Sequence, residues 1–149
     1  MQFKVPSIKE INCELRDFEY YFDLPFDQDE LGVSYHVRTS FSDKNTIIFF
    51  LHFRYTYGSN NRSLYHTDYL SLINVNEDIK EEDEMVKIDK DYLSHLLGTS
   101  ILMIRGSMHE RLSKHILKDY PFPIINPREL LEDDLTFEDD KFFIIIDKD

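Results

Sequence analysis

Residues 31–57 decide the fold class, with the sequence LGVSYHVRTSF, then SDKN, then TIIFFLHFRYTY. Between Leu31 and Phe41, apolar or β-branched side chains alternate with small or polar ones, and this period of two predicts a strand with one covered face. Thr46–Tyr57 keeps one apolar face at the same period, although Ile48 and Phe50 make its first half apolar on both faces, and the polar residues 42–45 before it favour a turn. The two runs therefore predict neighbouring antiparallel strands.

Two other runs extend this predicted sheet. Asn12–Phe22 alternates with a change of phase near Arg16, which predicts a strand with a bulge or bend there. Leu64–Val75 predicts a fourth strand, which follows a turn at residues 58–61. Because short turns link the later strands, the four runs together indicate an antiparallel, meander-like sheet.

The period changes after an acidic connector, Asn76–Glu84. Apolar residues then recur at steps of three and four, which predicts one long helix that begins after an N-cap at Asp89 and ends near Leu117. Its apolar face consists of Leu93, Leu96, Leu97, Ile101, Ile104, Met108 and Leu112. Gly98 and Gly106 lie on a second face, where they either let another helix or a sheet approach closely or are merely tolerated.

Prolines mark the exit from this helix. Two of them extend the chain, and Pro127 starts a short helix with Asn126 as its cap. The tail, residues 133–149, is acidic and then apolar, and it forms either an extra strand or a mobile recruiting segment. We therefore expect one α+β domain over residues 1–149, with a four-stranded antiparallel sheet packed against one long helix and a short C-terminal helix.

Composition removes several function classes. The chain has 149 residues, of which 17 are basic and 29 acidic, and the net charge of −12 disfavours nucleic acid and anionic membranes and suits a basic partner. No apolar run approaches the roughly 18 residues that a membrane span needs. The single Cys13 and the absence of a secretory signal at the start predict a reducing, cytoplasmic location.

No catalytic or metal-ligating constellation stands out. The 6 histidines are scattered, there is no cysteine pair, and no glycine-rich phosphate motif occurs, so we expect neither zinc nor nucleotide. Cys13 shares an apolar phase with Ile11 and Leu15, which predicts an inert, partly buried thiol. The sequence therefore predicts a protein that is not an enzyme and carries no cofactor.

Aromatic side chains are frequent, with 9 tyrosines and 12 phenylalanines. Several crowd the region around Pro25, namely Phe18, Tyr20, Tyr21, Phe22 and Phe26. These rings are either core with ordinary exposed neighbours or the wall of an exposed groove. Contiguous exposed apolar surface usually marks a binding site, and a groove of this kind suits extended, unfolded polypeptide.

The long helix and its exit resemble the SecB family of protein-export chaperones. The similarity rests on Ile104-Arg105-Gly106, on YPFPIINPREL at residues 120–130, and on the order of elements over residues 8–132. It implies a homotetramer, built as a dimer of dimers, that holds unfolded polypeptides without nucleotide. The tail 138–149 is not the basic tail that binds the export motor SecA in some members. Docking of this motor on an acidic face of the sheet stays open as an alternative.

By position, residues 23–30 match the crossover loop of that family. The resemblance therefore implies a client-binding groove lined by Phe18, Tyr20, Phe22, Phe26, Val33, Tyr35, Val37, Leu93 and Leu97. The strand and helix residues in this set could equally be core. The implied contact between dimers is the glycine-bearing helix face, with Gly98, Leu102 and Gly106. Two rival functions stay open: a chaperone or inhibitor of one partner, such as a toxin–antitoxin pair, and an enzyme or ligand carrier.

Overall fold

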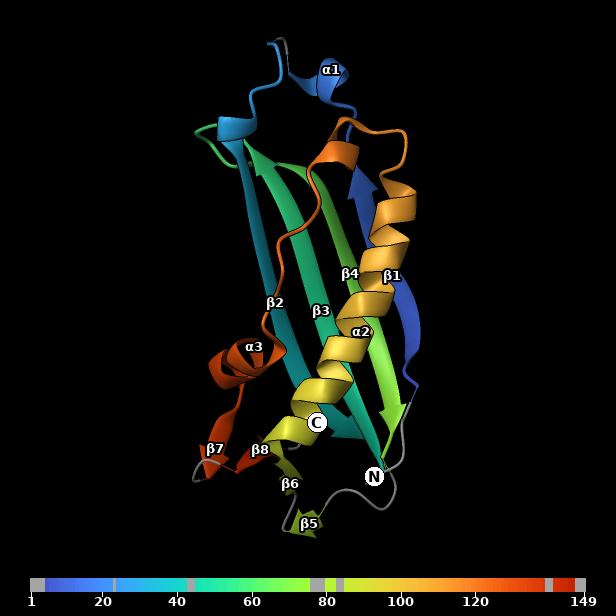
Figure 1. Ribbon diagram of the computed structural model, residues 1–149, viewed down its shortest axis with the longest axis vertical. Helices are drawn as coiled ribbons and strands as arrows, with labels where there is room; N and C mark the ends of the chain where they lie inside the picture. The colour runs from blue at the N-terminus through green and yellow to red at the C-terminus, as the bar shows by residue number, and fades with distance from the viewer. Residues whose placement is uncertain are drawn as a thin grey trace.

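The structure is a computed structural model that describes residues 5–22, 24–42, 45–75, 80–82, 85–138 and 141–146. Its main sheet has four antiparallel strands in the order β1-β4-β3-β2 (Figure 1). The strands are β1 (Ser7–Leu15), β2 (Leu31–Ser42), β3 (Thr46–Tyr57) and β4 (Arg62–Asn74). With a long helix, α2 (Lys90–Arg111), and a short helix, α3 (Pro127–Asp134), this sheet confirms the predicted α+β fold.

Strands β2, β3 and β4 form the predicted meander, in which Leu31 lies opposite Tyr57. Strand β1 instead pairs with β4, so the chain between β1 and β2 crosses one end of the sheet. The bulge in β1 lies between Glu10 and Asn12, earlier than the predicted position near Arg16. Alternation along a strand sets which face a side chain takes but not which strand lies beside it, so this neighbour could not be read from the pattern.

The predicted strand Asn12–Phe22 is wrong beyond Leu15. The chain turns there into a single helical turn, α1 (Phe18–Tyr21). The turn forms because the Asp17 carboxylate accepts the Glu19 N–H (3.2 Å), which is the usual N-cap bond. The apolar residues that looked like a second strand phase therefore belong to a helical turn.

Helix α2 begins where the sequence predicts. Asp89 Oδ1 accepts the Tyr92 N–H (2.9 Å), but the helix runs only to Arg111 and not to Leu117. It ends early because His115 Nδ1 accepts the Leu117 N–H (3.1 Å), which starts a 3-10 turn instead. None of the helices in the described ranges is both long and apolar enough to cross a membrane.

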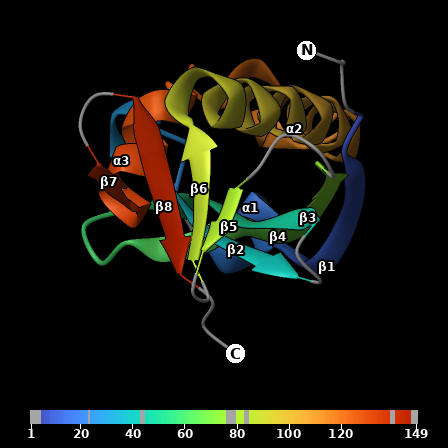
Figure 2. The same cartoon turned by 90° about the horizontal axis from the view of Figure 1, so that it is seen from below.

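The smaller helical elements connect these parts. The 3-10 turns are η1 (Gln28–Glu30) and η2 (Ile116–Asp119). Helix α3 starts at Pro127, as predicted. Asn126 caps it, because Asn126 Oδ1 accepts the Arg128 N–H (3.0 Å). Helix α2 covers one face of the main sheet, as Figure 2 shows, and the fully buried core lies between them.

The tail forms an extra strand, which was one of the two expectations for it. A second antiparallel sheet lies at one end of the molecule in the order β5-β6-β8-β7 (Figures 1 and 2). Its strands are β5 (Lys80–Glu82), β6 (Met85–Asp89), β7 (Thr136–Glu138) and β8 (Phe142–Ile146). Phe143 and Ile145 are fully buried, so one face of the apolar run of the tail belongs to the core, whereas Ile146 at its end is 51% exposed. Residues 76–79 and 83–84 of the predicted acidic connector lie outside the described residues.

The face of the main sheet opposite α2 carries histidine and arginine side chains. His36 lies opposite His52 across β2 and β3, with ring centroids 4.9 Å apart, and Arg54 lies opposite His66. Asp68 is hydrogen bonded to His52 on the same face. Glu14 lies opposite His66 on this face, which therefore carries charged groups of both signs. The docking of an export motor on a sheet face stays a prediction.

Candidate functional site

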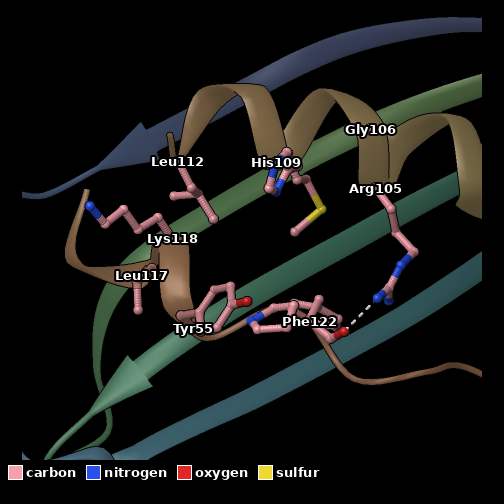
Figure 3. A pocket seen from close by; sticks show the side chains of 10 residues that line it. Tyr55, Arg105, Gly106, His109, Leu112, Leu117, Lys118 and Phe122 are labelled. Atoms are coloured by element: carbon pink, nitrogen blue, oxygen red, sulfur yellow. Dashed lines mark hydrogen bonds between the residues drawn. The ribbon is translucent and has the colours of Figure 1, made fainter. Parts of the chain in front are cut away.

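An apolar groove runs along α2, between this helix and the proline segment (residues 120–126). It holds two adjoining cavities of about 320 and 450 Å³, and Arg105 lines both. The first cavity, drawn in Figure 3, lies between the C-terminal half of α2, the Tyr55 side chain of β3 and Phe122. The second lies between the middle of α2 and residues 124–127. Apolar side chains supply most of both walls.

The proline segment lies on the sheet without pairing with its strands. Pro121 and Pro123 carry no backbone N–H, so the edge of the segment that they share lacks donors for pairing with a strand. Phe122 between them is buried, and its ring meets those of Phe53 and Tyr55 edge to face, each at 5.3 Å between centroids. Burying a phenylalanine stabilises by about 1.5–3 kcal/mol, which holds the segment beside α2.

Arg105 bridges the groove between the two cavities. Its Nη1 donates to the Pro123 carbonyl and its Nη2 to the Phe122 carbonyl, both at 2.7 Å. Such paired, charge-assisted bonds fix geometry well, so the guanidinium ties α2 to the proline segment. At the far end of the first cavity the Tyr55 hydroxyl donates to the Tyr120 carbonyl (2.5 Å). Burial raises the pKa of Tyr55 to about 12, which keeps this phenol protonated at neutral pH.

The two banks of the second cavity expose large apolar side chains. Leu102 on α2 is 72% exposed, and Ile124 on the proline segment is 93% exposed. In the first cavity the helix side is open at Gly106, where an added β-carbon would have no neighbour within 4 Å. The groove is therefore accessible along its length and can accept apolar groups from outside.

The predicted aromatic groove is a packed cluster of rings at the other end of the sheet. Phe18 is buried, and its ring lies 5.0 Å from Phe22, 5.2 Å from Phe26 and 4.9 Å from Tyr57 between centroids. Phe22 and Phe26 are half-buried and face the cluster themselves. The side chain of Tyr20 lies outside the described residues. These rings lie together as predicted, but they mainly pack against one another.

The strand and helix residues of the predicted groove differ in their exposure. Val37, Leu93 and Leu97 are buried in the core between α2 and the sheet, so they do not line an accessible groove. Period-two and period-three-to-four apolar positions point at the core, which explains this correction. Tyr35 is half-buried against Phe122, at 5.7 Å between ring centroids, and Val33 is 41% exposed on the same strand.

The predicted contact between dimers falls on the groove. A β-carbon at Gly98 would lie 3.3 Å from the Pro127 Cγ, so the close approach there is made by α3 of the same chain. Leu102 lines the second cavity and Gly106 the first. A second copy and a bound client would therefore compete for this face.

Sequence reasoning missed the residues of the groove that come from two separate segments. Arg105, His109 and Lys118 line the first cavity, and Ile124 lines the second. A signal was present in the alternating prolines, which favour an extended segment with few donors for pairing with a strand. The helix residues that face this segment could not be predicted, because they depend on the path that the chain takes after α2.

No protein-family model matches this chain, and no curated protein matches it at a significant level.

Within the described ranges, no three histidine, cysteine, aspartate or glutamate side chains are placed to hold a metal ion. Cys13 is a half-buried free thiol, and burial and the nearby Glu10 raise its pKa.

Proposed function

We propose that this protein is an ATP-independent holdase, which binds apolar segments of unfolded or pre-export polypeptides in the groove beside α2. The observation that carries the proposal is the pair of adjoining cavities with exposed Leu102 and Ile124 on opposite banks. Water-soluble proteins expose large contiguous apolar surface mainly where something binds. The resemblance to SecB, stated above on residues 104–106 and 120–130, supports the same function.

The length of the groove suits an extended chain. Ile101 lines the second cavity and Met108 the first, seven positions later on α2. Seven helical residues span about 10 Å. An extended polypeptide covers about 10 Å in three residues, and its side chains alternate between two faces. Apolar anchors two to four positions apart in a client would therefore reach both cavities.

Affinity in this proposal comes from burying apolar side chains, at about 25 cal/mol per Å² before the cost of ordering the client. Such binding depends on the apolar content of a client more than on one sequence, and it needs no nucleotide. We place the activity in the cytoplasm, where the free Cys13 would stay reduced. The homotetramer and the docking of SecA remain predictions from the resemblance, and sedimentation of the pure chain tests the first.

Light scattering of a slow-folding, aggregating protein tests the proposal. We expect stoichiometric amounts of this chain to suppress the scattering without nucleotide, and an equally acidic inert protein to have no effect. Unchanged aggregation from a sample that circular dichroism shows to be folded would exclude a general holdase. The alternative would then be a dedicated chaperone or inhibitor of one partner, such as a toxin–antitoxin pair, and co-purification would identify that partner.

A further inference from the structure

The groove differs in charge from the rest of the chain. Two cationic side chains line the first cavity, with Lys118 and Arg105 at opposite ends and the imidazole of His109 on α2 between them (Figure 3). No aspartate or glutamate lines either cavity, although the chain carries 29 acidic residues and a net charge of −12. Glu110 and Asp119 are sequence neighbours of His109 and Lys118 but line neither cavity.

These cations are not neutralised within the part of the chain that the structure describes. Arg105 donates to two carbonyl oxygens, which carry no net charge. The side chains of His109 and Lys118 have no hydrogen bond or ion pair with any described residue. Both side chains are exposed, so a ligand in the groove meets the Lys118 ammonium group directly.

Resting on the proposed function, we propose that the groove selects apolar polypeptide segments that carry carboxylates beside their apolar anchors. An anchor in the first cavity places its neighbours in the client chain near Lys118 at one end and near Arg105 at the other. A carboxylate between two anchors lies beside the Arg105 guanidinium, which has two of its five N–H donors in the bonds to the proline segment. The net charge of the chain would favour basic clients at long range, whereas the groove favours acidic ones on contact.

Three matched fluorescent peptides of about twelve residues test this selection by anisotropy. All carry two leucines four positions apart, and the intervening and flanking polar positions hold glutamate, glutamine or lysine. We expect the glutamate peptide to bind tightest and the lysine peptide weakest, with about 1.5- to 5-fold in affinity for each ion pair. Raising the salt concentration should shrink the difference, because these charges are exposed.

Lys118→Glu is the diagnostic variant, and Lys114→Glu is its control. Both lysines are exposed and both changes alter the net charge equally, but only Lys118 lines the cavity. We expect Lys118→Glu to lose the preference for the glutamate peptide and Lys114→Glu to keep it. Circular dichroism establishes that both variants are folded.

Three outcomes would overturn the inference while leaving the holdase proposal intact. They are equal affinity for the three peptides, tightest binding of the lysine peptide, and equal effects of the two variants. Failure of every peptide to bind a folded sample would instead overturn the proposed function itself. The two failures are therefore distinguishable in one set of titrations.

Discussion

Replacing Leu102 and Ile124 together by serine should weaken client binding and leave the fold unchanged. Leu102 is 72% exposed and Ile124 is 93% exposed, so neither side chain supports the core. Both line the second cavity, and a polypeptide segment bound there would cover both. The double variant therefore separates binding from folding more cleanly than any change in the buried aromatic residues.

The size of the effect follows from the exposed fractions. Burying a whole leucine or isoleucine side chain stabilises by about 1.5–3 kcal/mol. Scaled by exposures of 72% and 93%, a client recovers about 1–2 kcal/mol at Leu102 and about 1.4–2.8 kcal/mol at Ile124. Ordering of the client offsets part of this gain. We expect the double variant to bind about 10- to 100-fold more weakly, since each 1.4 kcal/mol corresponds to a factor of ten.

Anisotropy of an apolar reporter peptide measures the affinity, and urea unfolding of the same samples measures stability. Met103→Ser is the matched control, because Met103 is 42% exposed on α2 but lines neither cavity. Unchanged affinity in the double variant, at an unchanged urea midpoint, would refute the reasoning and place the client elsewhere. An equal loss in Met103→Ser would show that general surface apolarity, and not the groove, binds the client.

Three other predictions concern the buried Phe122, the two glycines of α2 and the titration of His36. Phe122→Ala should destabilise the fold by about 3–5 kcal/mol, because it removes the buried anchor of the proline segment; a shift in the urea midpoint below about 1 kcal/mol would contradict that anchoring. Gly106→Ala should stabilise by about 0.5–1 kcal/mol through helix propensity. Gly98→Ala should gain less in the same unfolding assay, because its β-carbon presses on Pro127 at 3.3 Å. Burial and the charge of His52 lower the pKa of His36, so protonation favours the unfolded chain, and stability should fall as the pH drops below about 6.5. A thermal-melting series should show a shallower acid decline in His36→Gln, and an identical decline would remove His36 as its cause.

The strands and helix starts were readable from local pattern. Leu31 to Phe41 alternates throughout, Thr46–Tyr57 keeps one continuous apolar face although its first half is apolar on both faces, and β2 and β3 cover both runs. Asp89 and Asn126 cap the two helices as predicted, because a cap bond involves residues only two or three positions apart. Where a local bond competed with the pattern, as at Asp17, the prediction was wrong, because apolar spacing alone does not separate a strand from a single helical turn.

Less of the candidate site could be predicted from the sequence, because its walls come from distant parts of the chain. The aromatic residues near Pro25 were singled out for their number, yet Tyr57 from β3 and Tyr120 from after η2 complete their packing. Arg105 and Phe122 are 17 positions apart and meet only because the chain reverses after α2. No local sequence pattern predicts such a long-range contact.

The sequence by itself determined the α+β class, the long helix and its cap, the extended proline segment and the net charge of −12. These follow from periods, caps and missing N–H groups that act over a few residues. Only the tertiary structure decided that β1 lies beside β4, that the tail forms a strand with a buried face and that an apolar groove lined also by Arg105 and Lys118 opens beside α2. The physical reason is that burial and charge neutralisation depend on which distant segments meet, and that is settled when the whole chain packs.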